Sequence, residues 1–195
     1  MRAEELRLDE LIRFSEGLVD LHGARLAIHD TASLGQFRRD LIHMVGEDDA
    51  RRILTRKGYF AGQSCAATME RLFQWDSLEE WLKAGMRLSR ILGLAIADSI
   101  SLNLDKATGC YSMEFTLQDS VEVDECLTEF GISDKSGCWG LMGFASGYAS
   151  YCLGKSVYFV ERECCSRGDK DRPKNNFRIS FWGGIQLRDA HLFIP

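Results

Sequence analysis

The stretch VERECCSRGDKDRPK, from Val160 to Lys174, contains two adjacent cysteines shortly after a glutamate. Thiolates and carboxylates are ligands that zinc accepts, so Glu161, Cys164 and Cys165 could contribute to a metal site. The two cysteines could instead form a redox pair, although a disulfide between adjacent residues strains the peptide that joins them. They could also be small buried side chains without a chemical role. The stretch alone does not decide between these interpretations.

The composition of the chain is that of a single domain in a reducing cytoplasm. Its 195 residues are 45% hydrophobic and 27% charged, which suits both a core and a polar surface. Seven cysteines is an odd number and the N-terminus lacks a signal peptide, so a disulfide framework is not expected. No window of about 18 apolar residues predicts a membrane span. The net charge of −5 argues against direct contact with nucleic acid, and Arg38 and Arg39 are expected on a solvated helix face.

The elements that must position these side chains are helices and strands in mixed order. Strict alternation predicts an antiparallel hairpin from strands 95–104 and 110–117, with a turn at 105–109. Helical periodicity and strand patterns predict the other elements. The expected helices are 6–14, 31–45, 47–74, 78–92, 119–130 and 138–154, and the other strands lie within 17–29 and at 157–163 and 177–182. This order favours an α+β fold, with an antiparallel sheet flanked by helices.

The sequence also predicts how the helix 31–45 begins and packs, and where the helix 47–74 contacts a neighbour or breaks. Asp30 or Thr31 is expected to cap the helix 31–45, whose apolar face would carry Leu34, Phe37, Leu41 and Ile42. Small residues at 58–62 indicate either a close helix contact or a break.

Three segments carry a family resemblance: GYFAGQ at 58–63, QDSVEVDECLTEFG at 118–131, and CWGLMGFASGYASYCLGKSVYFVERECCSRGD at 138–169. Their order and spacing, from about Leu6 to Asp169, resemble the sensory domain of XylR-type, sigma-54-dependent bacterial activators of aromatic catabolism. The resemblance implies a Bet3-like, vinyl-reductase-type ligand-binding fold and a cytoplasmic homodimer that a small aromatic molecule switches from a buried apolar pocket. Residues 1–30 would form an N-terminal dimerisation segment, 31–182 the ligand-sensing domain, and 183–195 a tail or the start of a linker.

The resemblance also implies a zinc site. In the family, zinc is held by a Cys before Trp, by the Glu and Cys of a Glu-x-x-Cys strand, and by a later Cys. The first three match Cys138, Glu161 and Cys164, whereas Arg172 stands where the fourth ligand is expected. The sequence therefore predicts three quarters of a zinc site.

The fourth ligand has several candidates. Cys165 could take the place, but successive strand residues point to opposite faces, so the chain would have to bend. Asp169, Asp171 or water could also complete the site. Without a substitute, the zinc would be lost and the matched cysteines would be packing residues. Packing is the expected role of the other four cysteines, which are Cys65, Cys110, Cys126 and Cys152.

The resemblance also places a pocket. Phenol-responsive members contact the ligand hydroxyl with a His and a Trp, and the matching residues here are Ser89 and Leu117. Both phenol contacts are therefore absent, which favours an apolar or differently shaped ligand. Leu82, Met142 and Phe159 match further pocket positions. Ordinary core packing would explain each of these five residues equally well.

We therefore expect a ligand-sensing regulatory domain for a small aromatic or hydrophobic effector, with its output ATPase or DNA-binding domain elsewhere. The chain has no GxxxxGK[ST] phosphate-binding loop. One alternative is an assembly module, in which the pocket would be filled. A reductase-related enzyme is the other, but there is no GxGxxG fingerprint after a strand, and Glu114, Asp119 and Glu122 are expected on exposed faces. We expect no enzyme activity.

Overall fold

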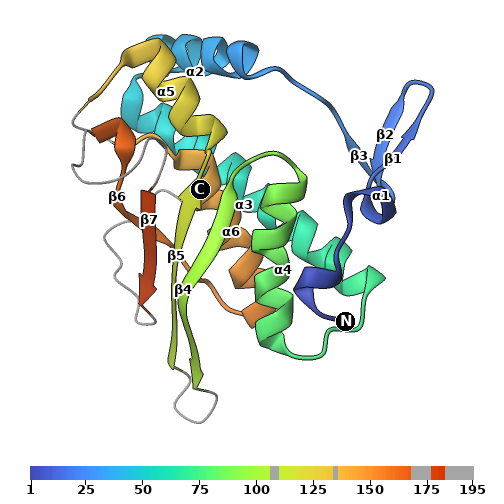
Figure 1. The fold of residues 1–195 in the computed structure, drawn as a ribbon. Helices are drawn as coiled ribbons and strands as arrows, with labels where there is room; N and C mark the ends of the chain where they lie inside the picture. Colours follow the sequence, from blue (N-terminus) through green and yellow to red (C-terminus); the bar gives the residue numbers. More distant parts are fainter. Residues whose placement is uncertain (106–109, 134–135, 168–176, 183–195) are drawn as a thin grey trace.

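The computed structural model describes residues 1–105, 110–133, 136–167 and 177–182 (Figure 1). The central part of the expected hairpin turn, the candidate ligands Asp169 and Asp171, and the expected tail at 183–195 lie outside these residues.

The first 26 residues form a small sheet and short helical turns. A 3₁₀ turn (Ala3–Glu5) and α1 (Leu8–Leu11) precede the antiparallel strands β1 (Arg13–Ser15), β2 (Leu18–Leu21) and β3 (Ala24–Leu26). The expected helix at 6–14 is therefore wrong at its C-terminal end, because β1 pairs with β2 instead of continuing the helix.

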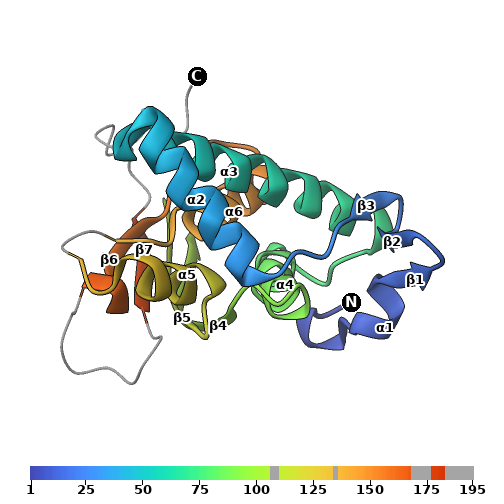
Figure 2. The same ribbon diagram turned by 90° about the horizontal axis from the view of Figure 1, so that it is seen from above.

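A tight turn joins β2 and β3, both of which lie within the expected strand segment 17–29. His22 and Gly23 both have positive φ, at 47° and 96°. The side chain of Asp20 accepts hydrogen bonds from the Gly23 amide, which stabilises this tight connection. The small sheet stands apart from the main sheet, with α4 between them (Figures 1 and 2).

Three long helices follow: α2 (Thr31–Val45), α3 (Glu47–Leu72) and α4 (Leu78–Ile91). The cap of α2 is confirmed as Asp30, whose carboxylate accepts a hydrogen bond from the Ser33 amide at 2.8 Å. Gly46 separates α2 from α3 with a φ of 82°, a conformation that favours glycine.

The main sheet has four antiparallel strands in the order β4-β5-β7-β6. The strands are β4 (Ile96–Asp105), β5 (Cys110–Gln118), β6 (Val160–Glu163) and β7 (Phe177–Trp182). Between β5 and β6 the chain forms α5 (Val121–Phe130) and α6 (Trp139–Leu153), and a 3₁₀ turn (Cys165–Arg167) follows β6. The expected α+β class, with an antiparallel sheet and flanking helices, is confirmed.

Helices α3 and α6 pack at unusually short distance. A Cβ atom at Gly147 of α6 would overlap the carbonyl oxygen of Tyr59, and one at Gly62 of α3 would overlap that of Phe144. The small residues at 58–62 therefore mark a close helix contact and not a break. The contact fixes α6 inside the molecule, where it runs from the β6 end of the sheet toward α4 (Figure 1).

Within the described residues, no helix is both long enough and apolar enough to cross a membrane.

Candidate functional site

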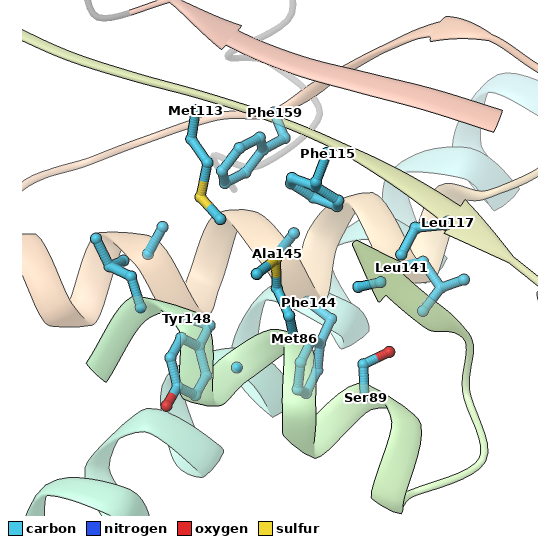
Figure 3. Close-up of a pocket in the computed structure, with 14 residues that line it drawn as sticks. Met86, Ser89, Met113, Phe115, Leu117, Leu141, Phe144, Ala145, Tyr148 and Phe159 are labelled. Carbon is cyan, nitrogen blue, oxygen red and sulfur yellow. The ribbon is translucent and has the colours of Figure 1, made fainter. Parts of the chain in front are cut away.

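An apolar cavity lies where α4, α6 and the β4–β5 hairpin meet (Figure 3). Alternation along β5 directs Met113, Phe115 and Leu117 inward, and all three are buried. The α6 residues that face β5 across the cavity are three or four positions apart, so they share one face of the helix. The full lining is Leu82, Gly85, Met86, Ser89, Ala97, Met113, Phe115, Leu117, Leu141, Phe144, Ala145, Tyr148, Ala149 and Phe159.

Four of the five expected pocket residues line this cavity, and they are Leu82, Ser89, Leu117 and Phe159. Met142 is buried but does not belong to the lining. The neighbouring Leu141 lines the cavity instead, because the helix face that carries it also carries Phe144 and Ala145. A helical-wheel count from Phe144 would have selected Leu141.

Both hydroxyl groups in the lining already donate hydrogen bonds within the fold. The Ser89 hydroxyl donates to the Ala95 carbonyl oxygen at 3.2 Å, and the Tyr148 hydroxyl donates to the Trp81 carbonyl oxygen at 3.1 Å. The Tyr148 hydroxyl points away from the other labelled side chains (Figure 3). Burial raises the pKa of Tyr148, so this hydroxyl stays protonated. The cavity therefore offers a ligand apolar walls and only the acceptor capacity of Ser89.

The cavity has a volume of ≈ 40 Å³. A single water needs roughly 10–15 Å³ and a cavity that binds benzene is about 150 Å³, so the space is real but smaller than a site already open to an aromatic ring. Met86 from α4 and Met113 from β5 point toward each other across it (Figure 3). Methionine side chains change rotamer at low cost, so these two can make room for a ring.

A second cluster brings together three of the four expected metal ligands. One donor atom each from Cys138, Glu161 and Cys164 lies within 4.8 Å of the others. Cys138 is the N-cap of α6, Glu161 lies in β6, and Cys164 follows β6 directly. Both thiols are buried, at 0% and 1% exposure. The side chain of Cys165, the fourth expected ligand, is not among the described ones.

The electrostatics of the cluster favour one thiolate. The pKa of Cys164 is lowered to about 5, mainly because it accepts a hydrogen bond from Cys138. Burial raises the pKa of Cys138 and of Glu161. A hydrogen bond at 2.9 Å also joins Cys164 to the Ser166 hydroxyl.

These residues fit a metal ion. Ligand atoms on a tetrahedral zinc lie about 3.3–3.8 Å apart, so small side-chain movements bring the three donors onto one ion. The Oε1 atom of Glu161 is buried and has no hydrogen-bond partner among the described residues. An unsatisfied buried carboxylate oxygen is costly, and a cation would remove that cost.

A third cluster surrounds Arg38, which the sequence interpretation placed on a solvated face. Arg38 is only 2% exposed. Its Nη2 forms an ion pair with Glu122 at 3.2 Å, and its Nε lies 3.5 Å from a carboxylate oxygen of Glu125. Its Nη1 donates to the Gly137 carbonyl oxygen at 2.6 Å. The expectation of exposed positions for Arg38 and Glu122 is therefore wrong.

The error came from the assumed apolar face of α2. Phe37 is 50% exposed, while Arg38 turns inward because α5 presents two carboxylates opposite it. Acidic residues at three-residue spacing, Glu122 and Glu125, were the available signal. Arg39, by contrast, is exposed as expected and pairs with Glu129 at 2.6 Å.

Comparisons with known proteins agree with this geometry. The family model described as "Activator of aromatic catabolism" (XylR_N) matches residues 7–105. The chain is similar to the crystal structure of the phenol-responsive sensory domain of the transcription activator PoxR with phenol. The TM-score is 0.84 at 29% identity, and the match covers 96% of this chain and 94% of that one.

Two curated relatives are regulators. The transcriptional regulatory protein XylR of Pseudomonas putida is 31% identical over 194 residues, which is 98% of this chain and 34% of that protein. The phenol regulator MopR of Acinetobacter guillouiae is 32% identical over 146 residues, 75% of this chain and 26% of that protein. The chain thus spans about a third of the length of these relatives. With its family model, its relatives and its fold in agreement, the chain belongs to the XylR_N family of activators of aromatic catabolism.

Proposed function

We propose that this chain is an effector-sensing domain that binds a small, largely apolar aromatic molecule in the cavity between α4, α6 and the β4–β5 hairpin. The observation that carries the proposal is an apolar cavity at the positions expected to contact the effector. The PoxR sensory domain, of similar fold, is described with phenol. The assembly alternative required a filled interior around Ser89 and Leu117, and a cavity lies there.

The effector proposed here is an aromatic ring without a hydroxyl group, such as toluene. Ser89 and Leu117 replace the His and Trp that contact the phenol hydroxyl in phenol-responsive members, and the Ser89 hydroxyl already donates to Ala95. A buried ligand hydroxyl without its partners costs about 1–3 kcal/mol.

Zinc is the metal proposed for Cys138, Glu161 and Cys164, with Cys165, Asp169, Asp171 or water as fourth ligand. Two thiolates and a carboxylate suit zinc better than the hard cations, which prefer oxygen alone. Bound zinc would tie the first turn of α6 to β6 and so hold one end of the helix that lines the cavity. We assign it a structural role.

The wider proposal is a cytoplasmic homodimer that signals to an output ATPase or DNA-binding domain. The N-terminal segment 1–30 is proposed as the dimerisation segment, and its exposed Phe14 and Ile28 (66% and 78%) favour this. The sensing domain would be 31–182. We propose neither enzyme activity nor direct nucleic-acid contact, in line with the net charge of −5.

Thermal unfolding with a panel of monocyclic aromatic compounds tests the effector proposal. A true effector at about 100 times its Kd adds about 2.7 kcal/mol, which raises Tm by roughly 5–10 °C. Ala145→Leu fills the cavity from α6 and serves as the matched control, because it should unfold cooperatively but lose the ligand shift. A panel that leaves the wild-type Tm unchanged, or shifts both proteins equally, would contradict binding in this cavity.

A further inference from the structure

Residues 137–141, which include the N-cap and the first turn of α6, are held by two side chains from other helices. Arg38 of α2 donates to the Gly137 carbonyl oxygen, and its guanidinium centre lies 4.9 Å from the centre of the Trp139 ring. Glu122 of α5 accepts from the amides of Gly140 at 2.9 Å and Leu141 at 3.1 Å, one with each carboxylate oxygen.

Cys138, a proposed metal ligand, lies in the middle of this segment. Its own side chain caps no amide of α6. Glu122 therefore replaces the missing cap, since its carboxylate satisfies two of the free amides at the positive end of the helix. The position of the Cys138 thiol thus depends on groups that are not ligands themselves.

The ion pair between Arg38 and Glu122 makes this arrangement stiff. The two side chains are 3% and 14% exposed, so neither charge is screened well by water. Arg38 makes contacts on both sides of Cys138, and Glu122 fixes the following turn. Moving Cys138 would break charged hydrogen bonds in a buried place, which is costly.

We infer that Arg38 and Glu122 are positioning residues that hold Cys138 in the geometry required for metal binding. The inference rests on the proposed metal site and adds two residues from helices that contribute none of the proposed ligands. Hydrogen-bond partners that orient metal ligands typically account for about 10–100-fold in metal affinity.

The test compares Glu122→Gln and Arg38→Lys with the controls Glu129→Gln and Arg39→Lys. The controls change a pair of the same residue types, formed by Arg39, which is 47% exposed and one residue further along α2, and Glu129 of α5. Each purified chain is stripped of metal with a chelator and titrated with Co²⁺, whose visible spectrum reports thiolate ligands and tetrahedral geometry. Zn²⁺ is then used to displace Co²⁺ and gives the zinc Kd. Unfolding midpoints are measured in parallel.

The expected result is a zinc Kd at least about tenfold weaker in Glu122→Gln and Arg38→Lys, with an altered Co²⁺ spectrum, while both controls match the wild type. If Glu122→Gln does not fold, the zinc Kd and Co²⁺ spectrum of Arg38→Lys, which retains the positive charge, test the inference. Wild-type spectra and affinity in folded Glu122→Gln or Arg38→Lys would overturn the inference. A wild-type chain that binds neither metal would instead contradict the metal site itself.

Discussion

The apolar cavity and the first turn of α6 both involve the same helix, yet they satisfy their polar groups in opposite ways. Along the cavity, the hydroxyls of Ser89 and Tyr148 are satisfied by nearby backbone carbonyls, and the rest of the wall is apolar. At the first turn of the helix, the buried charges on Arg38 and Glu122 are satisfied by each other, by Glu125 and Cys126 of α5, and by backbone groups of residues 137–141.

This difference indicates that the cavity end determines which ligand fits, whereas the charged end holds the structure together. Apolar walls with flexible methionines can change shape at small cost, so one fold can be adapted to ligands of different size. Buried charged groups cannot be changed singly, because the partner that remains is left without compensation. The cavity end is therefore the tolerant region and the charged end is the sensitive one.

The largest expected effect is at Arg38. Arg38→Met leaves Glu122 and Glu125 buried beside each other without their cation, which should lower the free energy of unfolding by about 3–5 kcal/mol. Arg39→Met, one residue further along α2, removes a cation that is 47% exposed, against 3% for Arg38, and should therefore cost less, about 1 kcal/mol. Urea unfolding of both variants measures the difference. Equal losses would erase the proposed distinction between buried and exposed charge.

A smaller effect is expected from pH. Burial raises the pKa of Glu125 to about 7, although Arg38 and Lys57 oppose the shift and Glu122 adds to it. An unfolded glutamate titrates near pH 4.3, so between these values the folded chain binds more protons than the unfolded one. The contribution of Glu125 to the free energy of unfolding should therefore fall as the pH rises from about 5 to 8, by about 1–3 kcal/mol.

Glu125→Gln identifies the group responsible. Glutamine cannot titrate, so the fall in unfolding free energy between pH 5 and 8 should be smaller in this variant. Denaturant unfolding at several pH values provides the measurement. A variant whose stability depends on pH as steeply as that of the wild type would assign the effect to other groups.

The smallest effect is expected in the cavity wall. Leu117→Met conserves volume and polarity at a position 3% exposed, so it should change stability by less than about 1.5 kcal/mol. Because Leu117 lines the cavity, the aromatic compound that raises Tm most should differ between Leu117→Met and the wild type. A loss as large as that of Arg38→Met would show that the cavity end is as intolerant as the charged end.

Much of this organisation could be predicted from the sequence, for identifiable reasons. Alternation in β5 and the cap at Asp30 are local signals, and both elements were placed within two residues of their bounds. A family pattern, and not local periodicity, predicts that Cys138, Glu161 and Cys164 lie together.

The remaining features depend on contacts between distant segments. The burial of Arg38 arises from two carboxylates of α5 that lie more than 80 positions away in the chain, so α2 alone gives no sign of it. Likewise, Leu141 rather than Met142 lines the cavity because of the rotation of α6, which its close packing on α3 determines. Charged residues on an amphipathic helix are usually solvated, and that general rule gave the wrong result here.

Titration calorimetry of the wild-type chain with toluene and with phenol tests the central claim most directly. The cavity predicts one toluene bound per chain, with phenol at least about fivefold weaker, since its hydroxyl meets no free donor and a single acceptor. Absence of toluene binding, or tighter binding of phenol, would contradict an effector site of this polarity.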